Sequence, residues 1–309
     1  MKVLVTGSRG FLGSWLVEDF RLAGHDVFAL SRSETNLLEK DQVKKVLERV
    51  RPDCIVHAAG LVGGIQANMA NNFGFLYNNL TIGANLVSAA IETEIPKFLN
   101  ISSSCIYPPE APQPFKESQV LTGALEKTNE GYALAKISTQ KLVDYASYQF
   151  GLDYRTLIPS NLYGPRDNFN PESSHMLAAI LFKLGLAIKD KQNVVEIWGD
   201  GSARREFTYV GDLSYWVSNE AINLISTMPQ ALNVGFGSDY SVSEYYSVAS
   251  QALSYQGEFT YLKDKPTGMI QKLMDSSLAN ALGWKPTTDL TEGIRLTVKW
   301  MEKNVEILG

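Results

Sequence analysis

The stretch of residues 2–13 reads KVLVTGSRGFLG. It opens with a short run of strand-forming residues, after which Gly7, Gly10 and Gly13 lead into a helix-like pattern. In such a strand–loop–helix unit the first glycine permits the tight turn, the second lets a pyrophosphate approach the backbone, and the third lets helix and strand pack closely. The free N–H groups at the helix start would face the anion. The stretch therefore predicts a dinucleotide site.

Strand-like and helix-like segments alternate onward from this stretch. The patterns predict strands over 2–6, 26–30, 54–57, 97–101 and 154–158, and helices over 11–23, 39–50, 71–93 and 130–150. Strands that alternate with helices imply a parallel sheet covered on both faces. We therefore expect an α/β fold, in which residues 1–165 form a Rossmann-type doubly wound parallel sheet that binds the dinucleotide.

The pattern changes after Pro159, where loops rich in Gly, Pro and Asn separate shorter elements. We expect helices over 174–188, 212–225, 242–253 and 289–303, and strands over 194–198 and 258–261. Residues 166–309 are therefore expected to form mainly a smaller, C-terminal substrate-binding cap, with some segments returning to the Rossmann domain.

Composition excludes several classes of protein. The formal net charge of −5 over 309 residues gives no general attraction to nucleic acid or to anionic membranes. The most apolar run, 176–188, is too short to span a bilayer and carries Lys183. The two cysteines, Cys54 and Cys105, suggest neither a disulfide framework nor a metal cluster. We expect a cytoplasmic protein that binds no nucleic acid, membrane or metal.

The end of the second predicted strand bears on the choice of cofactor. An NAD site usually has an acidic residue there, to bind the ribose 2′-hydroxyl, whereas this chain reads ALSR over 29–32. Arg32 and Arg9 offer two guanidinium groups suited to a 2′-phosphate, although both could be ordinary surface arginines. Ala58, after the third strand, is small enough for a dinucleotide to lie against it. We therefore predict NADP(H).

A catalytic group is suggested by Tyr132 and Lys136, which lie four residues apart and so share one face of a predicted helix. A nearby ammonium should lower the pKa of the phenol and prepare it for proton transfer. Ser103 follows the fourth predicted strand, at the sheet edge where such folds bind ligands, and its hydroxyl could hold a ketone oxygen. The alternative is a polar turn beside a half-buried tyrosine.

Longer stretches carry a more specific resemblance. They are VGGI at 62–65, SSCIYP at 103–108, TNEGYALAK at 128–136, NLYGPRDNF at 161–169, SH at 174–175, WGDG at 198–201 and REF at 205–207. With the glycine loop, they resemble the GDP-L-fucose synthases of the extended short-chain dehydrogenase/reductase superfamily. That family comprises NADPH-dependent 3,5-epimerase/4-reductases that act on a GDP-4-keto-6-deoxy-mannose. The match runs over nearly the whole chain in the same order.

The resemblance implies a role for each matching residue. Ser103, Tyr132 and Lys136 would form the reductase group, and Cys105 and His175 the acid/base pair for epimerisation. The cofactor would contact Gly7, Arg9, Gly10, Phe11, Gly13, Arg32, Ala58, Tyr132 and Lys136. The nucleotide sugar would contact Asn161, Lys183, Trp198, Arg205 and Lys272.

Two departures from the family pattern concern substrate specificity. Lys183 stands where arginine is common, and Gly60-Leu61 precedes VGGI where Ala-Lys is expected.

A thiol and an imidazole suit proton transfer at carbon, because small shifts bring both pKa values near neutrality. Without the resemblance, Cys105 would be interpreted as a buried apolar residue and His175 as a helix cap.

Several functions remain open from the sequence. The first is the complete epimerase/reductase reaction, giving GDP-L-fucose or a close analogue. The second is reduction alone, or epimerisation alone, of a related GDP-sugar such as a GDP-6-deoxy-4-keto-heptose. The third is a non-catalytic NADP-binding module. The resemblance also implies a homodimer joined through the long helices over 71–93 and 130–150.

Overall fold

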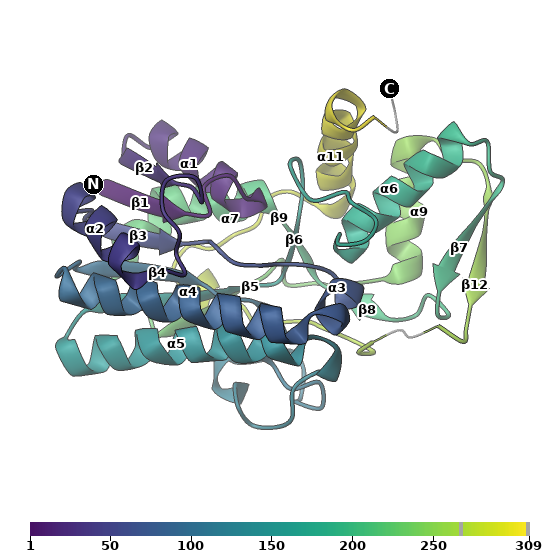
Figure 1. The fold of residues 1–309 in the computed structure, drawn as a ribbon. Coiled ribbons are helices and arrows are strands. Elements are labelled where there is room, and N and C mark those ends of the chain that lie inside the picture. Colours follow the sequence, from purple (N-terminus) through teal and green to yellow (C-terminus); the bar gives the residue numbers. More distant parts are fainter. Residues whose placement is uncertain (266–267, 307–309) are drawn as a thin grey trace.

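The computed structural model describes residues 1–265 and 268–306, and a parallel six-stranded sheet lies at its centre (Figure 1). Its strands, in spatial order, are β10 (Ala231–Val234), β5 (Asp153–Pro159), β4 (Lys97–Ile101), β3 (Cys54–His57), β1 (Lys2–Thr6) and β2 (Asp26–Leu30). Every neighbouring pair is parallel. The predicted Rossmann-type sheet is confirmed.

The order of the strands creates a crevice at one edge of the sheet. The chain proceeds from β1 to β2 on one side and from β3 to β10 on the other, so the direction reverses between β1 and β3. In the register of these strands Thr6 lies beside His57. Open α/β sheets bind ligands at such a reversal, outside the carboxyl ends of the strands.

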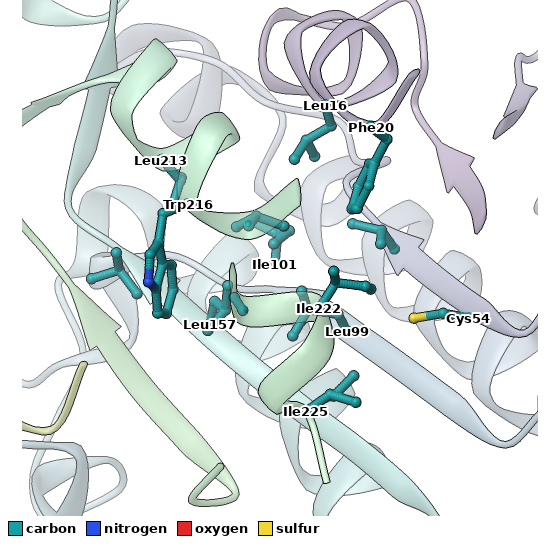
Figure 2. Packing of buried hydrophobic residues seen from close by; sticks show 14 of the residues in the cluster. Leu16, Phe20, Cys54, Leu99, Ile101, Leu157, Leu213, Trp216, Ile222 and Ile225 are labelled. Carbon is teal, nitrogen blue, oxygen red and sulfur yellow. The ribbon is translucent and has the colours of Figure 1, made fainter. Parts of the chain in front are cut away.

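Alternate residues of each strand enter two separate cores. On one face, Val3 and Val5 of β1 pack with Leu16 and Phe20 of α1 (Phe11–Leu22) and with helix residues such as Leu213 and Trp216 (Figure 2). On the other face, the sheet is covered by α2 (Lys40–Val50), α4 (Asn72–Glu92) and α5 (Glu130–Phe150). Burial on both faces explains why these strands read as continuous apolar runs.

Helices α4 and α5 lie side by side along the sheet (Figure 1). They approach closely at Gly83, where an added Cβ would lie 2.1 Å from Oγ1 of Thr139. This contact fixes α5, and α5 carries Tyr132 and Lys136.

The cap is built around a third core on the other side of the molecule (Figure 1). It contains β6 (Asn161–Tyr163), α6 (Met176–Lys189), β7 (Val194–Trp198), β8 (Arg204–Arg205), β9 (Phe207–Tyr209), β11 (Tyr240–Ser241), α9 (Val242–Leu253), β12 (Glu258–Leu262) and α11 (Leu290–Asn304). β10 and α7 (Val210–Trp216) pack with the sheet instead. The division at residue 165 stays a prediction, and 307–309 lie outside the described residues.

Most of the long elements end within two residues of their predicted bounds. The helix predicted over 212–225 is divided instead into α7, a π-helical turn over Val217–Ala221 and α8 (Ile222–Leu224). Short elements are not predicted by the sequence pattern, because so few residues show no periodicity. They include α3 (Ile65–Ala70), α10 (Ser277–Asn280), β8 and β11. Among the described residues, no helix is long and apolar enough to cross a membrane.

Candidate active site

The glycine loop places backbone groups at the crevice between β1 and β3. Gly7 has φ +68°, and a Cβ on it would lie 2.8 Å from the backbone of Ala59. Gly10 is the N-cap of α1 and is exposed, so the first N–H groups of this helix remain open to a ligand. Gly7 therefore allows the tight turn against Ala59, Gly10 leaves the helix start open, and the loop fits a dinucleotide.

A buried polar pair, Thr6 and His57, lies where β1 and β3 end beside this crevice. Oγ1 of Thr6 lies 3.0 Å from Nδ1 of His57 and accepts a hydrogen bond from the backbone N–H of Ala59 at 3.2 Å. Burial lowers the pKa of His57 to about 3, so the imidazole is neutral. The sequence analysis did not single out this pair, although both residues end neighbouring strands.

The loop after β2 presents Arg32 to solvent, and Arg9 is likewise exposed in the glycine loop. The Glu34 carboxylate folds back onto Ser31, accepting hydrogen bonds from its N–H and its hydroxyl, each at 2.9 Å. These two bonds hold the pKa of Glu34 below its usual range. Glu34 therefore shapes the loop, and both predicted guanidinium groups stay available for a phosphate.

Tyr132 and Lys136 occupy the first two turns of α5, as the spacing predicts. The Lys136 ammonium donates to the backbone oxygen of Ile101 at 2.9 Å and lies 5.6 Å from the centre of the Tyr132 ring. Ser103 follows β4 by two residues, and its hydroxyl lies close enough to the Tyr132 phenol to lower the pKa of that phenol. The structure brings the three predicted reductase residues together.

The predicted direction of the Tyr132 pKa is wrong. Burial raises this pKa above its usual value, and the charge of Cys105 would raise it further. Burial also lowers the pKa of Lys136 to about 8. Spacing along a helix could indicate the proximity of the two groups, but the larger desolvation effect depends on how the rest of the chain covers them.

Cys105 and His175 lie in different parts of the chain and share a neighbour, Lys272. Cys105 lies in a single 3-10 turn, Ser104–Ile106, directly after Ser103, and His175 is the N-cap of α6. The Lys272 ammonium is close enough to both to lower their pKa values.

The expectation of near-neutral pKa values for this pair is also wrong. Burial raises the pKa of the Cys105 thiol and lowers that of His175, which moves both away from neutrality. A neutral thiol and a neutral imidazole therefore face the site at pH 7. Burial lowers the pKa of Lys272 to about 8, so its positive charge is available to stabilise a thiolate when one forms.

The VGGI stretch supports His175. The N–H of Gly64 donates to the backbone oxygen of Ser173 at 3.0 Å, and a Cβ on Gly64 would lie 2.7 Å from the backbone oxygen of Ser174. Only glycine allows this approach without displacing the segment that leads into α6. The stretch therefore fixes the backbone that leads into α6, where His175 is the N-cap.

The expected substrate residues fall into two groups. In the first, Arg205 lies on β8, close enough to Lys272 to lower the pKa of that lysine. The Asn161 amide belongs to the same group, because it donates to the backbone oxygen of Glu206, the residue after Arg205, at 3.3 Å. In the second, Lys183 donates to the backbone oxygen of Glu196 on β7, two residues before the exposed Trp198.

Comparison with known proteins identifies the family. The model of the NAD dependent epimerase/dehydratase family matches residues 3–225. The chain belongs to this family. Among curated relatives, the GDP-L-colitose synthase of Yersinia pseudotuberculosis is 44% identical over 98% of this chain and 99% of its own length. The GDP-L-fucose synthase of Azorhizobium caulinodans is 41% identical, covering 97% and 96%.

Solved structures give the same result. A GDP-6-OMe-4-keto-L-xylo-heptose reductase from C. jejuni superposes with a TM-score of 0.90 at 26% identity, covering 98% of this chain and 97% of its own. A GDP-mannoheptose C4 reductase from Campylobacter jejuni with NADP bound gives 0.86 at 28% identity, covering 97% and 98%. The family resemblance found in the motifs is confirmed. The roles of individual site residues stay predictions.

Proposed function

We propose that this protein is an NADPH-dependent epimerase/reductase that converts a GDP-4-keto-6-deoxy-mannose-type sugar to GDP-L-fucose or a close analogue. The observation that carries the proposal is the meeting of two proton-transfer groups at one site. The phenol of Tyr132 lies beside Ser103 and Lys136, and the Cys105 thiol lies within electrostatic range of this phenol and of Lys272. The relatives named above support a GDP-sugar substrate.

Epimerisation is the task that we assign to Cys105 and His175. A ketone at C4 acidifies the hydrogens on C3 and C5, so a base can remove one of them and leave an enolate. Return of a proton to the opposite face inverts the carbon. One group must accept a proton and another must donate one, which a neutral imidazole and a neutral thiol can do. The Lys272 ammonium would stabilise negative charge during this exchange.

Reduction is the task that we assign to Ser103, Tyr132 and Lys136. NADPH, when bound, supplies hydride to C4. The Ser103 hydroxyl would hold the ketone oxygen, and Tyr132 would donate the proton that this oxygen needs. The Lys136 ammonium would stabilise the tyrosinate that remains, because it lies 5.6 Å from the ring centre and is fixed by Ile101.

Binding of NADPH rests on the loop at the start of α1. Gly10 and Phe11 would line the pyrophosphate, Gly7 and Gly13 would give the loop the shape that binds it, and Ala58 would lie against the dinucleotide. The 2′-phosphate would lie between Arg9 and Arg32, which are both exposed. Two guanidinium groups at this position favour NADPH over NADH.

A second candidate function is reduction of a GDP-4-keto-heptose without epimerisation. It is favoured by the two C. jejuni structures, whose names describe heptose reductases. Lys183 and Gly60-Leu61 are the residues through which the sugar preference could differ. Products distinguish the two functions, since only the first inverts C3 and C5.

The test is incubation of the protein with a panel of GDP-4-keto sugars and NADPH, with the products resolved by NMR. We expect turnover of the 6-deoxyhexose to the L-sugar. Tyr132→Phe should lower kcat for NADPH oxidation by a factor of about 10² or more. Tyr148→Phe, at a side chain that is 91% exposed on the same helix, should leave kcat unchanged. Equal turnover by Tyr132→Phe and wild type contradicts the reductase assignment.

A homodimer is the assembly that we propose, with cytoplasmic localisation. Large apolar side chains project into solvent from α4 and α5, including Phe73, Tyr77, Tyr145 and Tyr148, which are 78%, 55%, 65% and 91% exposed. Such a surface is unusual on a monomer and suits a second copy of the same helix pair. Light scattering should give twice the chain mass, whereas Tyr148→Glu should give monomers. A wild-type monomer at micromolar concentration contradicts the dimer.

A further inference from the structure

A hydrogen bond within the protein core ties the turn that carries Cys105 to the sheet. Tyr107 follows Cys105 by two residues and is 1% exposed. Its hydroxyl donates to Oδ1 of Asn233 at 2.5 Å, and Asn233 lies on β10 with no exposed surface. A short 3-10 turn has few internal hydrogen bonds, so the bond to Asn233 does much to hold the turn in one position.

The Asn233 amide is also bonded through its other atoms. Nδ2 donates to the backbone oxygens of Phe115 and Asp275, at 2.8 and 3.2 Å. The Tyr107 ring stacks on the Phe115 ring with centres 5.0 Å apart. An amide provides one acceptor and two donors at this point, as these three contacts require. A carboxylate at the same position would face two carbonyl oxygens without a donor.

The same contacts extend to the segment that carries Lys272. The N–H of Phe115 donates to the backbone oxygen of Leu273 at 2.9 Å, and the N–H of Asp275 donates to that of Phe115 at 2.8 Å. Asn233 therefore joins the turn after β4 to the segment beside Lys272. Cys105 and Lys272, which lie close enough to shift each other's pKa, are therefore both on segments that are bonded around this one buried side chain.

We propose that Asn233 and Tyr107 are positioning residues that hold the Cys105 thiol for proton transfer at the sugar carbon. The proposal rests on the epimerase/reductase function proposed above. The reductase group also has bonds of its own, since Lys136 donates to the backbone oxygen of Ile101, and the N–H of Ser102, next to Ser103, donates to that of Leu157 at 2.8 Å. Loss of the Tyr107–Asn233 bond should therefore slow proton exchange at carbon far more than hydride transfer at C4.

Tyr107→Phe is the direct test, because it removes one oxygen and keeps the stacked ring. Two rates are compared in the full-length protein. One is deuterium incorporation at C3 and C5 of the GDP-4-keto sugar in D₂O, and the other is oxidation of GDP-L-fucose by NADP⁺, which needs no proton removal from carbon next to the ketone. We expect the exchange rate to fall at least about tenfold, since small displacements at a reacting centre are costly. The rate of GDP-L-fucose oxidation, and the KM for the sugar nucleotide in each of the two reactions, should stay within about twofold of wild type.

Tyr154→Phe is the matched control. Tyr154 is another buried tyrosine, with no exposed surface, and its hydroxyl donates to the backbone oxygen of Ile95 at 2.9 Å, away from Cys105. Loss of the Tyr154 hydroxyl should lower the melting temperature without changing the rate of deuterium incorporation or of GDP-L-fucose oxidation. If Tyr107→Phe keeps the wild-type exchange rate, or loses both rates equally, the positioning role is overturned.

A second measurement needs no turnover. Cys105 is 8% exposed and Cys54 has no exposed surface. Tyr107→Phe should increase the rate of Cys105 alkylation by iodoacetamide severalfold, as mass spectrometry of the labelled peptide would show, with Cys54 as the internal reference. An unchanged rate contradicts the proposal. A wild-type protein that incorporates no deuterium overturns the proposed epimerase activity instead, and this inference with it.

Discussion

A Cβ built on Gly13 would lie 2.0 Å from the backbone oxygen of Gly7. No larger side chain fits at this distance, so the first turn of α1 can approach the end of β1 only with glycine at position 13. Gly10 is different, because a Cβ there would lie 3.1 Å from the same oxygen. The two glycines therefore serve different purposes, and their substitution should have different consequences.

Gly13→Ala is expected to destabilise the fold, by about 1–3 kcal/mol or more, because the backbone of the loop must move. Gly10→Ala should cost little stability but weaken NADPH binding, since the added methyl group would occupy the pyrophosphate position. Urea unfolding measures the first effect and quenching of NADPH fluorescence the second. Similar stability of the two variants would contradict the packing role of Gly13.

Arg32→Ala should weaken NADPH binding by a factor of about 10 or more and leave NADH binding nearly unchanged. The reason is the loss of a charge-assisted hydrogen bond to the 2′-phosphate, typically worth about 1.5–3 kcal/mol. Arg21→Ala, at an exposed arginine on α1, is the control for charge alone. If Arg32→Ala weakens both cofactors equally, or neither, the assignment of the 2′-phosphate site is wrong.

Glu206 should make stability depend on pH. It is 1% exposed, accepts N–H groups of Gly237 and Met274 at 2.7 and 3.0 Å, and burial raises its pKa to about 7 from an ordinary 4.5. Between these values the folded state binds more protons than the unfolded state. The stability contributed by Glu206 is therefore present at low pH and decreases as pH rises from about 5 to 7, by up to about 1.4 kcal/mol per unit.

Glu206→Gln isolates this effect, because glutamine does not titrate. The stability of the wild type relative to this variant should fall across pH 5–7, measured by urea unfolding. Glu48→Gln, at an exposed glutamate on α2, provides the control and should give a difference that varies less. A wild-type advantage over Glu206→Gln that is constant from pH 5 to 7 would mean that Glu206 keeps its ordinary pKa.

The sequence predicted the parts of the site that depend on local geometry. The four-residue spacing of Tyr132 and Lys136 and the position of Ser103 after a strand were enough to place these groups together. Asn233 and Glu206 could not be found in this way, because their partners lie far away in the chain and nothing in their local sequence indicates burial. The pKa directions of Tyr132 and Cys105 failed for the same reason, since desolvation depends on the completed tertiary structure.

The central claim is that one site performs both proton exchange at carbon and hydride transfer. The most direct measurement is a reaction of the wild-type protein with GDP-4-keto-6-deoxy-mannose and NADPH in D₂O, with the product analysed by NMR and mass spectrometry. We expect GDP-L-fucose that carries deuterium at C3 and C5, with one NADPH consumed per product. A reduced product without deuterium at either carbon would contradict it, as would the absence of NADPH oxidation.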